Sequence, residues 1–362
     1  MNPSFQRMIF ASEAGFGRGA LPVRPRGCAR PLPNRNVVVT ADGRVRYARG
    51  MEPTDATAPQ SQDSQDGRRA VQRRGTVRVV TVAYNPGEEL VRFLDSLGRA
   101  SRRRVRVVIA DNGSEHELVR ETAERFGAEI VTDGTNRGYG GGANLAARDL
   151  DEDWVVVANP DIVWRPGSLD VLIDAGLNTA GAGCLGPRLL NPDGSVYPSG
   201  RALPTLVRGA GHAALTRVWP SNPFSAAYHS QGGNDAVREV GWLSGACLAL
   251  PAPVWRELGG FDEGYFMFFE DVDLGARVAR AGWRNVQVPA AVVVHEQGAS
   301  WKARPERMIR AHHASARRYL DGVYSAPWQA PLRWAVDGGL RLREELEVRV
   351  SAPRRPHPDR RK

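Results

Sequence analysis

Long hydrophobic runs are missing from this sequence. Of its 362 residues 42% are hydrophobic, yet the strongest apolar stretches, at 154–158 and 290–294, are only as long as a β-strand. A membrane-spanning helix needs about 20 apolar residues, so none is predicted. The first ten residues also lack the apolar core of a signal peptide. The length favours one large domain with appendages, or two domains.

Cysteine is scarce as well. Cys28, Cys184 and Cys247 are an odd number, far apart, and have no paired spacing of the kind that metal sites use. They predict neither a disulfide framework nor a structural zinc site. We interpret them as small buried hydrophobic residues in a reducing cytoplasm.

Lysine is almost absent, and the positive charge is unevenly placed. The chain has two lysines and a net charge of +9, but residues 1–75 carry +7 and residues 353–362 carry +4. The span between them has a net charge of −2. A duplex-binding domain needs its basic patch on the folded surface, where it can neutralise phosphates. The distribution therefore predicts no nucleic-acid partner.

Composition divides the chain into four segments. Residues 1–75 are rich in Arg, Gly, Pro and Ser and have no amphipathic period longer than the short run Val37–Thr40, which predicts a disordered basic tail. Met51 offers an alternative start within it. We expect a folded domain at 76–300, a helical extension at 301–350 and a second basic tail at 351–362.

Residues 76–300 alternate short apolar runs with helical patterns, which is typical of an α/β fold with a parallel sheet. Strands are predicted at 77–83, 105–110, 128–132, 154–158 and 291–294, with further ordered chain at 240–250. Helices are predicted at 88–99, 115–126 with Ser114 as cap, 142–150, 167–178, 271–281, 303–321 and 328–347. A hairpin turn is expected at 191–194 and an irregular segment at 198–238.

Polar side chains and glycines follow the predicted strands directly. They occur at Tyr84-Asn85, at Asp111-Asn112-Gly113-Ser114, at Asn136-Arg137-Gly138 and at Asn159-Pro160-Asp161. Each of these is also an ordinary turn sequence. In an open parallel sheet, however, ligands bind beyond the carboxyl ends of the strands. Four such segments in succession predict a binding site at that edge.

Seven ordered motifs resemble those of family 2 glycosyltransferases with the GT-A fold. They are Thr81-Val-Ala-Tyr-Asn85, Asp111-Asn-Gly-Ser114, Asn136-Arg-Gly-Tyr-Gly-Gly-Gly-Ala-Asn144, Asn159-Pro-Asp161, Trp242-Leu-Ser-Gly-Ala246, Gly260-Phe-Asp-Glu263 and Phe269-Glu-Asp-Val-Asp273. The similarity covers about residues 76–300 and is strongest to the rhamnosyltransferase branch, in which Asn-Pro-Asp replaces the commoner Asp-x-Asp. Within that branch, it resembles enzymes that move L-rhamnose from dTDP-rhamnose to GlcNAc-diphosphoryl-polyprenol.

The resemblance implies a Rossmann-like, mostly parallel sheet flanked by helices, and an inverting transfer from a nucleotide sugar. Asp111 would pair with the pyrimidine base. The residues it implies for nucleotide-sugar binding are Ala83, Tyr84, Asn85, Asp111, Asn112, Asn136, Gly138, Asn144 and Asn159. A family 2 transferase with another nucleotide sugar or acceptor is the alternative.

The chemistry of a nucleoside diphosphate leaving group points to a divalent cation, Mg²⁺ or Mn²⁺, on oxygen ligands. Asp161, at the mouth of a predicted buried strand, is the best candidate ligand. Asn159 stands where most of the fold class has an aspartate, and an amide cannot supply the same charge. By resemblance, His295 completes the metal or diphosphate site.

Three carboxylates begin a predicted helix and offer a base for the acceptor hydroxyl. Glu270 and Asp271 are adjacent, whereas Asp273 faces another way on the helix. Acids at a helix N-terminus also stabilise the helix without any catalytic role. The aromatic residues at 265–269, however, would desolvate these three carboxylates. By resemblance, Asp271 is the catalytic base, and Glu270, Asp273, Trp242, Ser244 and Gly245 orient it or bind the acceptor.

Two alternatives from other classes of function are a dehydrogenase and a non-catalytic binding module. Gly138-Tyr-Gly140-Gly-Gly-Ala143 fits the dinucleotide fingerprint of a dehydrogenase. Such a glycine turn should directly follow the first strand, which here ends in Tyr84-Asn85 with no glycine cluster. A non-catalytic nucleotide-sugar-binding module is the other alternative, and the intact set of acids argues against it.

The C-terminal helical patterns interleave arginines with aromatic and aliphatic residues over 301–347. This composition suits a surface that rests on anionic lipid, and equally a pair of helices packed on the catalytic domain. A lipid-linked acceptor would favour the first. We therefore expect a cytoplasmic protein peripherally associated with the inner face of the membrane.

Overall fold

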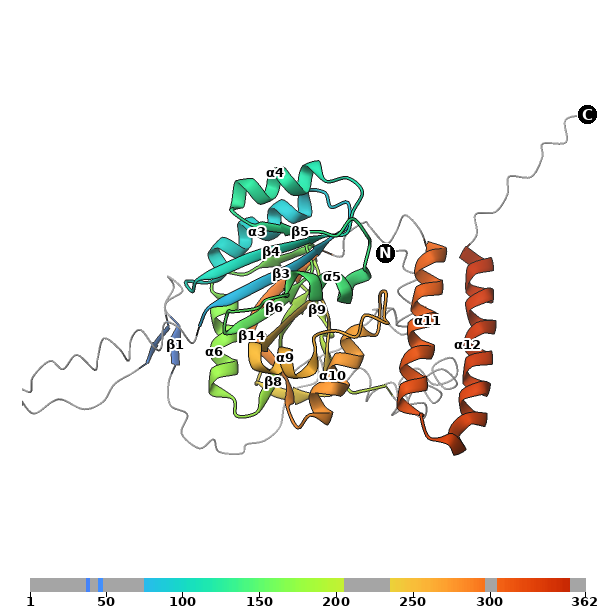
Figure 1. Ribbon diagram of the computed structural model, residues 1–362. Coiled ribbons are helices and arrows are strands. Elements are labelled where there is room, and N and C mark those ends of the chain that lie inside the picture. Colours follow the sequence, from blue (N-terminus) through green and yellow to red (C-terminus); the bar gives the residue numbers. More distant parts are fainter. Residues whose placement is uncertain (1–36, 40–44, 48–74, 205–234, 297–304, 352–362) are drawn as a thin grey trace, which may run out of the picture.

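The structure is a computed structural model that describes residues 37–39, 45–47, 75–204, 235–296 and 305–351. A ten-stranded mixed sheet forms its centre (Figure 1). Along the sheet the order is β11 (Arg238–Val240), β14 (Arg284–His295), β8 (Ala182–Leu190), β13 (Cys247–Pro251), β6 (Trp154–Ala158), β3 (Val77–Ala83), β4 (Val105–Asp111) and β5 (Glu129–Val131). Strands β7 (Ile162–Trp164) and β9 (Val196–Tyr197) pair with β14 and β8.

Six of these strands, β5, β4, β3, β6, β8 and β14, run in one direction, because β13 is antiparallel to both of its neighbours. The mostly parallel α/β fold predicted from the sequence is confirmed. The position of β13 between β6 and β8 was not predicted, since an apolar run carries no information about strand direction.

Helices cover both faces of the sheet. In β3, Val77 and Val79 face one core and Val80 and Val82 the other, as the period of two requires. The first core is covered by α3 (Glu88–Ala100), α4 (Glu117–Phe126) and α6 (Ser168–Asn178). The second is covered by α5 (Gly138–Ala146), α9 (Ala252–Leu258) and α10 (Glu270–Arg280). Burial on both faces explains why these strands are continuous apolar runs.

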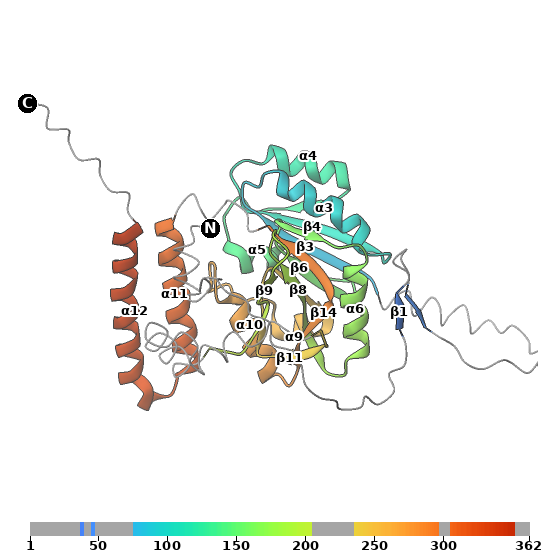
Figure 2. The same cartoon turned by 180° about the vertical axis from the view of Figure 1, so that it is seen from behind.

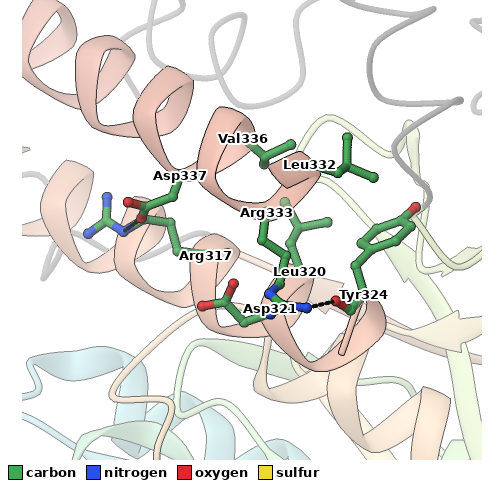
Figure 3. A pocket seen from close by; sticks show the side chains of 8 residues that line it. All are labelled: Arg317, Leu320, Asp321, Tyr324, Leu332, Arg333, Val336 and Asp337. Atoms are coloured by element: carbon green, nitrogen blue, oxygen red, sulfur yellow. Dashed lines mark hydrogen bonds and ion pairs between the residues drawn. The ribbon is translucent and has the colours of Figure 1, made fainter. Parts of the chain in front are cut away.

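Two long helices form a hairpin beside this domain (Figure 2). They are α11 (Pro305–Val323) and α12 (Ala330–Ser351), joined through the short η1 (Pro327–Gln329). The buried Glu344 of α12 accepts hydrogen bonds from Arg310 and Arg317 of α11. A small cleft between the two helices lies near their turn, where Arg333 donates to the Tyr324 carbonyl at 2.6 Å (Figure 3).

Several boundaries differ from the sequence prediction. Helix α5 begins at Gly138 rather than Gly142, and Gly140 and Gly142 within it let Phe261 and Val82 approach its backbone. Ser114 does not cap α4, because that helix begins at Glu117. The backbone N–H of Ser114 instead donates to the Asn85 side-chain oxygen. Strand β14 starts at Arg284 and includes Pro289, where a register shift accommodates the proline.

The N-terminal segment contains one pair of short strands among its described residues. Strands β1 (Val37–Val39) and β2 (Val45–Tyr47) pair antiparallel within the span expected to be disordered. The valine triplet at 37–39 favours a strand, and the sequence between the two strands contains Asp42-Gly43, which favours hairpin turns. The rest of residues 1–75, including Cys28 but not Gly75, lies outside the described residues. The same holds for residues 352–362 and for most of the irregular segment predicted at 198–238. Cys184 and Cys247 are buried and unpaired, as predicted.

None of the helices in the described part of the chain combines the length and apolar character that crossing a membrane requires.

Candidate active site

The end of β6 brings three predicted residues together. Asp161 Oδ1 lies 3.2 Å from His295 Nε2, and Asn159 Nδ2 lies 3.4 Å from the same nitrogen. Sequence separation would not suggest this contact, which arises because β7 pairs antiparallel with the end of β14 and sets His295 opposite Ile162. The carboxyl ends of β6 and β14 therefore share one group of polar side chains.

This group has the chemistry of a cation site. Asp161 and His295 are both largely buried, and the Nδ1 atom of His295 is buried without a hydrogen-bond partner among the described residues. A carboxylate, an imidazole and an amide form a mixed oxygen and nitrogen donor set that suits Mn²⁺. Among the described residues, no group of three or more His, Cys, Asp or Glu side chains is placed to hold a metal ion.

The second acidic group lies at the N-terminus of α10. Asp271 Oδ2 accepts the N–H of Gly245 at 2.8 Å, and Oδ1 accepts the N–H of Val272 at 2.8 Å. Glu270 is 7% exposed, and its Oε2 is buried without a partner in the described part of the chain. Two N–H donors stabilise a carboxylate, so the geometry places the negative charge on Asp271 and the proton on Glu270.

The pKa values of this pair follow from burial. Desolvation, with a smaller effect from the neighbouring Asp271, raises the pKa of Glu270 to about 8. Burial also raises the pKa of Asp271, while the hydrogen bonds from Gly245 and Val272 and the charge of Arg201 act in the opposite direction. A raised pKa makes the Asp271 carboxylate a stronger proton acceptor than an ordinary aspartate.

The other residues expected near the base have different surroundings. Asp273 turns away and forms an ion pair with Arg277, with 2.7 Å between Oδ2 and Nε. Trp242 Nε1 donates to the Ala202 carbonyl, and the ring lies beneath the Arg201 guanidinium. The N–H of Ser244 donates to the Ser199 carbonyl at 2.7 Å. Of these residues, Gly245 is the one that the structure brings into contact with Asp271.

Several asparagines predicted to bind the nucleotide sugar form hydrogen bonds to the backbone of neighbouring segments. Asn85, at a left-handed φ of 44°, accepts the N–H groups of Ser114 and Glu115. Asn112 Nδ2 donates to the Gly138 carbonyl at 2.7 Å, and Asn136 accepts the N–H of Gly138. Asn144 bonds both backbone groups of Phe261. These contacts fix the loops around the edge.

Asp111 ends β4 beside Ala83 and the exposed Tyr84 at the end of β3. Its carboxylate is already engaged, because Oδ1 accepts the N–H of Gly113 and Oδ2 lies 2.6 Å from His116 Nδ1. Sequence reasoning missed His116, although a histidine five residues after Asp111, at the start of a predicted helix, was a detectable signal.

A family model described as glycosyltransferase like family 2 matches residues 74–314. The chain belongs to this family. It is 45% identical over 288 residues to N-acetylglucosaminyl-diphospho-decaprenol L-rhamnosyltransferase of Mycobacterium tuberculosis strain H37Rv, covering 76% of this chain and 94% of that protein. It is 24% identical to rhamnosyltransferase WbbL of Escherichia coli K12, covering 67% of this chain and 92% of WbbL.

Among solved structures, the fold resembles the crystal structure of GalNAc-T7 with UDP, GalNAc and Mn²⁺. The TM-score is 0.51 at 15% identity, and the match covers 75% of this chain and 54% of that one. At this identity the likeness concerns the fold alone. Together with the family match it confirms the GT-A fold and an enzyme that transfers a glycosyl group, in place of a dehydrogenase or a non-catalytic module.

Two further residues of this family 2 glycosyltransferase were not predicted to be part of its site. The Tyr139 hydroxyl donates to the Gly245 carbonyl at 2.6 Å, which steadies the residue that bonds Asp271. Arg201, almost fully buried, lies over the rings of Tyr197 and Trp242. Arg201 belongs to a two-residue strand, β10 (Gly200–Arg201), within a segment whose sequence has no regular pattern, so no signal could have found it.

Proposed function

We propose that this enzyme transfers L-rhamnose from dTDP-L-rhamnose to GlcNAc linked to a polyprenyl diphosphate, in cell-wall or surface polysaccharide assembly. The observation that carries the proposal is the 45% identity to a rhamnosyltransferase with a decaprenyl-diphosphate-linked acceptor, over nearly the whole of that relative. The two acidic groups at the carboxyl edge of the sheet supply the chemistry.

In this proposal the acceptor hydroxyl oxygen forms a bond to the anomeric carbon from the face opposite the nucleotide. Asp271 takes the hydroxyl proton, and the nucleoside diphosphate leaves with the electron pair of the broken bond, so the configuration inverts. The backbone N–H of Gly245 orients the Asp271 carboxylate. Glu270, held neutral by burial, adds no second charge beside the base at neutral pH.

Asp161 and His295, with Asn159 beside them, would hold a Mn²⁺ or Mg²⁺ ion at the diphosphate. Such an ion neutralises charge on the leaving group when it is bound. Asp111 would face the pyrimidine base, where His116 already engages one of its oxygens.

A matrix of donors and acceptors tests the proposed specificity. Purified enzyme with Mn²⁺ or Mg²⁺ should release nucleotide fastest with dTDP-L-rhamnose and a short polyprenyl-diphosphate GlcNAc. Product analysis should then show a rhamnosyl-GlcNAc disaccharide with inverted configuration. Faster turnover of UDP-glucose, UDP-GlcNAc or GDP-mannose would assign the enzyme to another branch of the family.

We further propose that α12 contacts an anionic membrane surface that carries the acceptor, on the cytoplasmic side. Its outward stripe, Leu342, Leu346 and Val350, is spaced by four residues, about one turn of a helix, on the side opposite the buried Glu344. Leu342 is 64% exposed, and Trp328 just before the helix is 79% exposed. The sequence after α12, residues 353–362, has a net charge of +4, which complements anionic lipid.

Polar substitution of this stripe separates lipid contact from catalysis. The combined change Trp328→Ser, Leu342→Gln and Leu346→Gln should reduce binding to vesicles containing phosphatidylglycerol and lower activity on a long-chain acceptor in them. Activity on a soluble short-chain acceptor should persist, because none of the three side chains is buried. Leu177→Gln, an equally exposed leucine on α6, is the matched control. Equal loss on both acceptors would make α12 a structural support only.

A further inference from the structure

The chain leading into the catalytic acids has an unfavourable backbone conformation. Phe268 and Phe269 have φ values of 70° and 65°, in the left-handed region that a side chain disfavours. Phe269 directly precedes Glu270 and Asp271, and its carbonyl accepts the N–H of Asp273 in the first turn of α10. Two adjacent phenylalanines persist in this conformation only if their surroundings impose it.

Helix α11 supplies those surroundings from one side. His312 packs against both phenylalanine rings, with centroid distances of 5.5 Å to each. The Ser315 hydroxyl donates to the Met267 carbonyl at 2.8 Å, so it fixes the peptide that enters the strained pair. Tyr319, one turn further along α11, lies 5.7 Å from the Phe269 ring.

The start of the same loop is also tied to α11. Arg318 donates to both carboxylate oxygens of Asp262, at 3.0 and 2.8 Å, and its guanidinium lies over the ring of Tyr265. Arg307 lies over the ring of Phe266 in the same way. The positions of α11 that contact Met267, Phe268 and Phe269, namely 312, 315 and 319, are separated by three or four residues and therefore lie on one side of the helix.

On its other side the loop meets the N-terminus of α5. The N–H of Tyr139 donates to the Phe266 carbonyl at 3.0 Å. Gly138, at a φ of 73°, lies so close that a Cβ atom there would overlap that carbonyl. The loop is therefore clamped between α5, which also carries the Tyr139 hydroxyl bond to Gly245, and α11.

We propose that α11 is a positioning element for the catalytic base, in which His312 and Ser315 hold Phe268 and Phe269 in the left-handed conformation that aims Asp271 at Gly245. This inference rests on the proposed role of Asp271 as base. It gives the helical hairpin a role in catalysis on any acceptor, separate from lipid contact through the outward stripe of α12. Burial lowers the pKa of His312 to about 4, so its ring stays neutral and packs as an aromatic group.

Variants of the two positioning residues test the inference. His312→Ala and Ser315→Ala should each lower kcat on a soluble acceptor by about 10-fold to 100-fold, the range expected when a catalytic group is displaced by about 1 Å. The affinity for dTDP with Mn²⁺, measured by calorimetry, should stay unchanged, because Asp111 and the proposed metal ligands Asp161 and His295 lie on segments that α11 does not hold. His312→Phe keeps the ring contacts and should restore most of kcat.

The matched control is Arg317→Ala, which breaks ion pairs between α11 and α12 without touching the loop. Hydrogen exchange of amides 262–271 supplies a readout that needs no substrate: it should accelerate in His312→Ala and stay unchanged in Arg317→Ala. Normal kcat with unchanged exchange in both positioning variants would overturn the inference. Full activity of Asp271→Asn would instead overturn the assignment of the base.

Discussion

Replacement of Asp271 by asparagine should reduce the transfer rate by about 10²-fold to 10⁴-fold, the contribution typical of a general base. The amide keeps the size of the side chain and can still accept the N–H of Gly245 through its oxygen. It cannot take a proton from the acceptor hydroxyl. The loss should therefore appear in kcat, measured as nucleotide release at saturating donor and acceptor.

Donor binding provides the control for this variant. Calorimetry with dTDP and Mn²⁺ should give the wild-type affinity, because Asp161 and His295 lie at the ends of β6 and β14 and Asp271 lies at the start of α10. Glu270→Gln is the informative comparison. Below a pH of about 8 Glu270 is protonated, so a neutral amide resembles it and the loss should be smaller than for Asp271→Asn. The opposite order of losses would move the role of base to Glu270.

The carboxyl edge of the sheet could be predicted because its strands are locally determined. β3 and β6 have the predicted boundaries, since runs such as Trp154–Ala158 are buried on both faces and bounded by polar turns. The residues that follow a strand are then placed at the edge by chain connectivity alone. Asp161 was found in this way, whereas the acids of α10 were found from their place at the start of a predicted helix and from the resemblance.

What could not be predicted depends on contacts between distant segments. Strand β8 contains Gly183, Gly186 and Pro187, which favour a loop in isolation. The two glycines are needed because Trp283 and Leu243 pack directly against them. Neither neighbour is visible in the local pattern, so the strand was missed.

The same limit applies to the asparagines of the site. The sequence places Asn85 and Asn112 directly after strands and Asn144 in a predicted helix, but it does not give the direction in which each side chain turns. All three bond the backbone of a neighbouring loop in the structure, at Ser114, Gly138 and Phe261. An asparagine that follows a strand therefore predicts a rigid site edge as readily as a ligand contact, since its amide satisfies backbone groups that a turn leaves unpaired.

Replacement of Asp161 by alanine should abolish most of the metal-dependent affinity for the nucleotide, and the transfer rate should fall with it. Asp161 is the one carboxylate at the end of β6, because Asn159 supplies an amide in place of a second acid. Its loss would leave His295 and a neutral amide facing the diphosphate. A cation that bridges the protein and the diphosphate would then lose its only charged protein ligand at this strand.

Calorimetric titration of dTDP in the presence and absence of Mn²⁺ measures the effect directly. In the wild type, Mn²⁺ should strengthen dTDP binding, and in Asp161→Ala the two titrations should become nearly equal. His295→Ala should reduce the effect of Mn²⁺ by a smaller factor, since it removes a neutral ligand and keeps the carboxylate. Asp174→Ala, an aspartate on α6 remote from this edge, should behave like the wild type. If Asp161→Ala retains the full effect of Mn²⁺, Asp161 is a structural turn residue, and its contact with His295 serves to fix the ends of β6 and β14.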